Sequence, residues 1–213
     1  MHNLTVIETP LSAHWVTVLR DRETKPPQFR QAMANVTRYV FTEAARDIPL
    51  REITVRTPLQ ETTGTVIDTQ VVLVPILRAG QGMVDPILEY LPDARVGYLG
   101  MYRDEQSLNP VSYYFRLPEI ENNSQIYVID PMLATGGSAS LALKLVKEQT
   151  RSEYIKFLCI IAAPEGIKRL NDDHPHVRIY TAVLDEQLNE DAFIVPGLGD
   201  AGDRQYNTTE KDE

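Results

Sequence analysis

The stretch DPMLATGGS, residues 130–138, combines one acid with hydroxyl and glycine residues. It follows the apolar run IYVI and precedes a stretch with helical periodicity. Gly136 and Gly137 allow a phosphate to approach the backbone closely, and N–H groups at a helix start favour an anion. Thr135 and Ser138 add hydroxyl donors, whereas Asp130 suits sugar hydroxyls or the water shell of Mg²⁺. The stretch therefore predicts a phosphorylated sugar, although the glycines alone fit a helix-capping turn equally well.

Two other patterns point to nucleotides but lack the necessary context. GLGDAG, residues 197–202, matches G-x-G-x-x-G, yet only eleven polar residues remain after it and no βαβ unit can follow. No G-x-x-x-x-G-K-[ST] occurs, so a P-loop is excluded. We interpret HPH, residues 174–176, as a surface loop rather than a metal site, and Cys159 as a buried strand residue.

The elements that must position these residues alternate along the chain. Short, nearly all-apolar runs are separated by helix-like stretches, which indicates an α/β fold with a central parallel sheet covered on both faces. The expected strands are Val71–Leu77, Val96–Tyr102, Ile126–Ile129, Ile155–Ala162 and Val177–Leu184. In such a sheet, ligands bind beyond the carboxyl ends of the strands, where residues 130–138 lie.

The remaining segments complete a single domain, residues 1–213. Gln28–Arg46 has the apolar spacing of an amphipathic helix, and short strands at Ile53–Thr57 and Thr65–Ile67 predict a hairpin or arm. Residues 103–121 contain two prolines and show no sustained period. They are equally consistent with a surface hairpin and with a lid over a site.

Composition limits the class of partner. The 213 residues carry a formal charge of -9, which disfavours nucleic acid and anionic membranes. The apolar runs are far shorter than the roughly 20 residues of a membrane span, and the N-terminus does not resemble a targeting signal. We therefore expect a cytoplasmic protein whose anionic ligand binds a local positive site.

Together the motifs resemble the uracil phosphoribosyltransferase family of type I phosphoribosyltransferases. PILRAGQGM, GMYRDE, DPMLATGGSA, AAPEGI and IVPGLGDAGD occur in the family's order between residues 29 and 203. The loop at residues 130–138 is typical of the whole superfamily, whereas IVPGLGDAGD is specific to the uracil branch. The single acid of this loop, followed by Pro131 rather than by a second acid, also matches that branch.

The resemblance implies a type I phosphoribosyltransferase fold with a β-arm and the reaction of uracil with PRPP to give UMP and pyrophosphate, in pyrimidine salvage. It assigns residues 103–121 to a flexible hood and residues 185–206 to a uracil-binding hood. It implies catalytic roles for Arg103 and Asp200. The implied PRPP-binding residues are Arg78, Arg103, Asp130, Pro131, Met132, Leu133, Ala134, Thr135, Gly136, Gly137, Ser138 and Asp200. The implied uracil-binding residues are Ile194, Gly199, Asp200 and Ala201.

The resemblance also implies Mg²⁺, which we expect PRPP and water to hold without a protein ligand. It implies a homodimer or larger homo-oligomer and leaves activation by GTP open. No general base other than Asp200 suggests itself. Two alternatives remain at this stage: a phosphoribosyltransferase for another base, and a PRPP- or UMP-sensing regulator built on the same fold.

Overall fold

The computed structural model describes residues 3–103 and 110–208. Its centre is a nine-stranded sheet in the order β1-β11-β10-β8-β4-β6-β7, with β5 beside β4 and β9 beside β10. The strands are β1 (Leu4–Val6), β4 (Val71–Leu77), β5 (Arg95–Val96), β6 (Tyr98–Arg103), β7 (Pro110–Arg116), β8 (Gln125–Ile129), β9 (Met132–Leu133), β10 (Ile155–Ala162) and β11 (Arg178–Leu184). Neighbouring strands are parallel except for the antiparallel pair β6 and β7.

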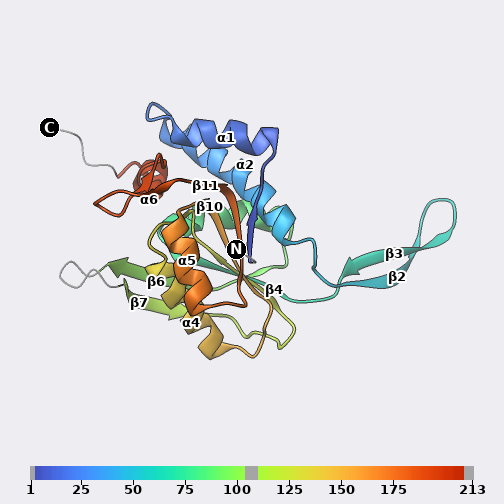
Figure 1. Ribbon diagram of the computed structural model, residues 1–213. Coiled ribbons are helices and arrows are strands. Elements are labelled where there is room, and N and C mark those ends of the chain that lie inside the picture. The colour runs from blue at the N-terminus through green and yellow to red at the C-terminus, as the bar shows by residue number, and fades with distance from the viewer. Residues whose placement is uncertain (1–2, 104–109, 209–213) are drawn as a thin grey trace.

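Helices cover both faces of this sheet (Figure 1). The helices α1 (Pro10–Arg20), α2 (Pro26–Ala44) and α3 (Val84–Leu88) pack on one face, and α4 (Gly137–Gln149) and α5 (Pro164–Asp173) pack on the other. Alternate residues of β4 serve the two cores: Leu73 joins the first, and Val72 and Val74 join the second. Because both faces are buried, the strands are continuously apolar, and the predicted α/β sheet is confirmed.

Smaller elements extend from this body. The strands β2 (Leu50–Arg56) and β3 (Glu61–Ile67) form an antiparallel hairpin that projects away from the sheet as the expected arm (Figure 1). A short pair, β12 (Gln187–Leu188) with β13 (Ile194–Val195), precedes helix α6 (Ala201–Tyr206). A 3₁₀ turn, η1 (Ala79–Met83), follows β4.

Residues 103–121 are more regular than their composition suggests. Strand β7 pairs with β6, with a register shift at Gly100 and Met101, so this part of the segment is a hairpin strand. Residues 104–109 lie outside the described residues, and the flexible hood stays a prediction. Within the part of the chain that the structure describes, no helix has the length and apolar character needed to cross a membrane.

Candidate active site

Three parallel strands deliver polar residues to one edge of the sheet. Strand β4 ends before Arg78, β8 ends before Asp130, and β11 ends before Asp185. Since these strands run in the same direction, their carboxyl ends share this edge, where ligands bind in open α/β sheets. The structure thus brings together the motifs that the sequence separates by more than fifty residues.

Residues 130–138, the phosphate loop, are fastened to the sheet on which they end. The carbonyl of Pro131 accepts hydrogen bonds from the N–H groups of Ile160 (2.9 Å) and Ile161 (3.1 Å). Met132 and Leu133 then form β9 against β10, a pairing that the sequence does not signal. The loop is consequently a rigid extension of the sheet rather than a free connection.

The end of the phosphate loop is shaped by glycine. Gly136 has φ of 78° and is the N-cap of α4, which begins at Gly137. An L side chain is strained in this region, and a Cβ at Gly136 would also lie 3.0 Å from the Cβ of Arg169. The first N–H groups of α4 thus lie beside backbone without side chains, as an anion site requires.

A glycine of α5 explains the AAPEGI motif. A Cβ on Gly166 would lie 2.5 Å from the carbonyl oxygen of Ala134 and 2.8 Å from that of Leu133. Helix α5 therefore packs directly against the backbone of the phosphate loop. The motif marks this glycine in the sequence, but its role follows only from the contact between the two elements.

Asp130 has an unusual electrostatic environment. It retains some solvent exposure, yet it lies deep enough in the fold that desolvation raises the pKa of its carboxyl to about 8. A backbone hydrogen bond from Met132 opposes this shift, and the negative charge of Asp200 adds to it. Asp130 is thus mainly neutral at pH 7 in the free protein, and the interaction places Asp200 at the same site.

Arg78 reaches across to α6. Its Nη2 atom donates to Oδ1 of Asp203 at 2.9 Å, and its carbonyl accepts from the hydroxyl of Tyr206 at 3.4 Å. More than half of its side chain is exposed at the site. The peptide bond between Leu77 and Arg78 is cis, which sequence does not foretell at a non-proline residue. Arg103 ends β6 at the same edge, and its side chain lies outside the described residues.

Residues 194–201, the base loop, form a tight turn before α6. Gly197 and Gly199 have φ of 66° and 75°, and the Val195–Pro196 bond is cis. Ile194 and Ala201 are buried. Asp200 is the N-cap of α6 and accepts a hydrogen bond from the N–H of Asp203 at 2.9 Å.

Two residues to which the sequence analysis assigns no individual role hold the base loop in place. Arg204 donates to the carbonyls of Leu198 (2.8 Å) and Leu19, and its guanidinium stacks 4.5 Å from the ring centroid of Phe29. Gln205 is buried and donates to the carbonyl of Ala79 at 2.9 Å. Because Leu19, Phe29 and Ala79 lie far from Arg204 and Gln205 in the sequence, no local pattern indicates these contacts.

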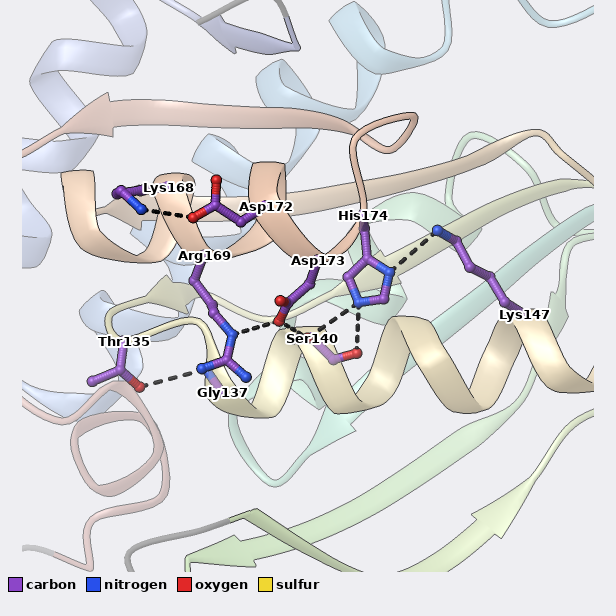
Figure 2. A network of polar contacts seen from close by, with 9 residues as sticks. All are labelled: Thr135, Gly137, Ser140, Lys147, Lys168, Arg169, Asp172, Asp173 and His174. Atoms are coloured by element: carbon purple, nitrogen blue, oxygen red, sulfur yellow. Dashed lines mark hydrogen bonds and ion pairs between the residues drawn. The ribbon is translucent and has the colours of Figure 1, made fainter.

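A polar network joins α4 to α5 behind the phosphate loop (Figure 2). The Ser140 hydroxyl donates to Asp173 at 2.6 Å, and His174 Nε2 lies 2.9 Å from the Ser140 carbonyl. His174 Nδ1 lies 3.2 Å from Lys147 Nζ. Since Nε2 must donate to a carbonyl, Nδ1 accepts from Lys147 and the ring is neutral.

The interpretation of HPH as a surface loop was wrong for its first histidine. His174 is only 7% exposed, because it caps α5 and turns its ring toward α4, whereas His176 is exposed. The expectation for Cys159 is confirmed: it is buried in β10, and burial raises the pKa of its thiol to about 12. Among residues 3–103 and 110–208, His, Cys, Asp and Glu side chains form no cluster of three or more that could hold a metal ion.

Comparison with known proteins decides the family. The family model described as uracil phosphoribosyltransferase matches residues 6–208. The chain belongs to the uracil phosphoribosyltransferase family. It is 49% identical over 210 residues to the family member of Salinibacter ruber, covering 99% of this chain and all of that one. The member from Lactococcus lactis subsp. cremoris is also 49% identical, with 98% of this chain and all of that one covered.

Solved structures agree with this membership. The AQ2163 protein of Aquifex aeolicus superposes with a TM-score of 0.90 at 36% identity, covering 98% of this chain and all of that one. The adenine phosphoribosyltransferase of Trypanosoma brucei gives a TM-score of 0.59 at 12% identity, covering 89% of this chain and 87% of that one. This second likeness concerns the fold alone, and it confirms the expected type I phosphoribosyltransferase fold.

Proposed function

We propose that the protein transfers the phosphoribosyl group of PRPP to uracil, forming UMP and pyrophosphate in pyrimidine salvage. The observation that carries this proposal is the meeting of the phosphate loop and the base loop at one sheet edge. The charge of Asp200 there contributes to the raised pKa of Asp130, and Arg78 pairs with Asp203 in the helix that follows the base loop. A phosphorylated sugar and a base can therefore bind side by side.

The phosphate loop suits the 5-phosphate and ribose. Residues 135–138 would surround the phosphate with the N–H groups at the start of α4 and with the hydroxyls of Thr135 and Ser138. Asp130 would bind ribose hydroxyls. A neutral carboxyl can both donate and accept there, and it adds no repulsion toward the nearby phosphates.

Arginine side chains suit the leaving group. As the bond from C1 to pyrophosphate breaks, positive charge develops on the sugar and negative charge on the pyrophosphate. Arg78 and Arg103 would pair with the phosphate oxygens, and Asp200 would lie beside the ribose as the negative charge nearest the developing cation. In our proposal positioning and charge stabilisation supply most of the catalysis, and no side chain is assigned as an essential base.

Backbone groups suit recognition of the base. Uracil has an N3–H donor flanked by carbonyl acceptors, whereas cytosine reverses this pattern at N3 and C4. Fixed backbone groups of Ile194, Gly199 and Ala201 would complement uracil and leave cytosine with mismatched partners. The positive φ angles of Gly197 and Gly199 fit a loop that presents its backbone in this way.

Mg²⁺ belongs to this proposal as a cofactor that PRPP and water hold. When bound, it neutralises charge that develops on the pyrophosphate. Asp130 and Asp200 are acidic residues of the two loops, and they would face its water shell rather than coordinate it directly. The cytoplasmic location, the homo-oligomer and activation by GTP stay predictions from the sequence.

The test is product formation by the purified protein with uracil, PRPP and Mg²⁺. We expect UMP and pyrophosphate to form in equal amounts. Chromatography measures UMP, and a coupled assay measures pyrophosphate. Binding of PRPP without formation of UMP would overturn the proposal and favour the sensing regulator.

A further inference from the structure

An ion pair with a buried carboxylate supports the base loop from behind. The side chain of Asp185 is 3% exposed and follows the end of β11. Its Oδ2 atom accepts from Arg20 Nη1 at 3.0 Å, and its Oδ1 atom accepts from Arg20 Nη2. The two residues are separated by 165 positions in the sequence and form a two-pronged arginine–carboxylate contact.

Both members of this pair also bind the backbone of Gly197. The N–H of Gly197 donates to Oδ2 of Asp185 at 2.8 Å, and the carbonyl of Gly197 accepts from Nη1 of Arg20 at 2.9 Å. The two polar backbone groups of one residue are thus tied to two opposite charges. Such contacts fix the orientation of the peptide planes on either side of Gly197.

The pair is itself anchored to rigid elements. The N–H of Asp185 donates to the carbonyl of Ala162 at the end of β10, at 2.8 Å. Arg20 stands in the last turn of α1, whose residue Leu19 is fully buried. The position of Gly197 is therefore set by the central sheet and by α1 together.

Gly197 has little freedom to compensate if this support is lost. Its φ is 66°, and a Cβ at this position would lie 2.0 Å from the carbonyl oxygen of Ile194. Ile194 and Gly199 are two of the residues expected to read the base. A shift at Gly197 would consequently move the backbone groups on both of its sides.

We infer that Arg20 and Asp185 are positioning residues that set the affinity and selectivity for the base, an inference that rests on the proposed function. Neither residue belongs to the groups expected to touch substrate. They act through the backbone of Gly197, whereas all but three of the residues expected to bind PRPP lie in the phosphate loop. Loss of the pair should therefore weaken uracil binding far more than PRPP binding.

Steady-state kinetics of Arg20→Met, Arg20→Lys and Asp185→Asn test this inference. Each variant removes hydrogen bonds from a charged network around the buried Asp185 carboxylate. The binding free energy lost with such bonds corresponds to about a tenfold change in a dissociation constant. We expect the KM for uracil to rise about tenfold in Arg20→Met and Asp185→Asn, with the KM for PRPP changing less than about twofold. Arg20→Lys should lie between these variants and wild type, since one ammonium replaces two donors.

Arg22→Met is the matched control, because Arg22 is 89% exposed in its side chain and pairs with its neighbour Glu23. It should leave both KM values unchanged. Arg20→Met and Asp185→Asn should also discriminate less strongly against cytosine than the wild-type protein does. If Arg20→Met fails to fold, the KM values of the milder variant Arg20→Lys test the inference.

Equal rises in both KM values, or no rise in the KM for uracil, would overturn the inference even if the melting temperature falls. A wild-type protein that forms no UMP would instead refute the proposed function. The two failures are therefore distinguishable in the same set of assays.

Discussion

At the scale of single residues, Asp130 is an acid of the site whose ionisation would destabilise the free protein. Its carboxyl is neutral up to a pH of about 8, whereas the same group titrates near 3.8 when it is solvated. The folded state therefore binds an extra proton between these values. By linkage, the stability associated with this group is complete below pH 3.8 and is lost as the pH rises through 8.

Asp130→Asn should remove this dependence. Because Asn cannot ionise, we expect the variant without ligands to melt about 2–4 °C above wild type at pH 9, and the difference to shrink toward pH 5. PRPP binding should weaken only slightly, because an amide, like a neutral carboxyl, can both donate to and accept from ribose hydroxyls. Thermal denaturation at the two pH values and PRPP titration check both effects. A variant less stable than wild type at pH 9 would contradict the electrostatic account.

At the scale of elements, α5 supports the phosphate loop through Gly166. Gly166→Ala would place a methyl group against two backbone carbonyls that cannot rotate away. We expect a loss of roughly 1–3 kcal/mol in the free energy of unfolding and a higher KM for PRPP. Gly64→Ala in the β-arm is the control, since its Cβ would meet only the Val55 side chain, at 3.3 Å, and Ile53 farther away. An unchanged KM for PRPP in Gly166→Ala would show that α5 does not position the loop.

His174 links α4 and α5 in a pH-dependent way. Burial lowers the pKa of its ring from 6.5, and the positive charge of Lys147 lowers it further. The unfolded chain therefore takes up a proton that the folded protein resists. The stabilisation is complete above pH 6.5 and is lost as the pH falls through the lowered pKa.

His174→Ala should cost about 1–3 kcal/mol of unfolding free energy at pH 7.5, through loss of its buried hydrogen bonds. The difference in unfolding free energy between wild type and variant should be smaller at pH 5. At that pH the wild-type protein is destabilised, because its folded state keeps the ring neutral while the unfolded chain binds a proton. Urea denaturation at both pH values measures this, with the exposed His176 changed to Ala as control. A deficit that is constant with pH would mean that the ring does not titrate in this range.

The elements also show how far sequence reasoning reaches. Strands β4 and β10 were predicted at their observed bounds, because each is a strongly patterned local run. Strand β9 was not predicted, because it depends on a partner distant in the sequence. The pairing of β7 with β6 agrees with the hairpin, one of the two interpretations of residues 103–121. Helix α1 and strand β1 also escaped prediction, as the short N-terminal run has a weaker pattern.

The same division applies to the site. Asp130, Arg78 and the base loop were selected from motifs, and the structure places them at one edge. Three supporting residues, Arg20, Asp185 and Arg204, received no individual role in the sequence analysis. Arg20 and Arg204 bind backbone carbonyls more than one hundred and fifty residues away, and Arg204 also binds one across a turn. Motifs single out the residues expected to touch substrate, whereas the role of a supporting residue follows only from its contacts in the structure.

At the scale of the whole molecule, an acidic chain presents one site to an anionic substrate. The formal charge of -9 repels anions at a distance, so the arginines and helix N-terminus at the sheet edge must act locally. The central claim is that this edge joins a phosphoribosyl site to a site that selects uracil.

Initial rates with PRPP, Mg²⁺ and each of uracil, cytosine, adenine, hypoxanthine and guanine test that claim most directly. The account predicts rapid formation of UMP, with every other base slower by a factor on the order of 10³ or more. Comparable turnover of cytosine or of a purine base would contradict it.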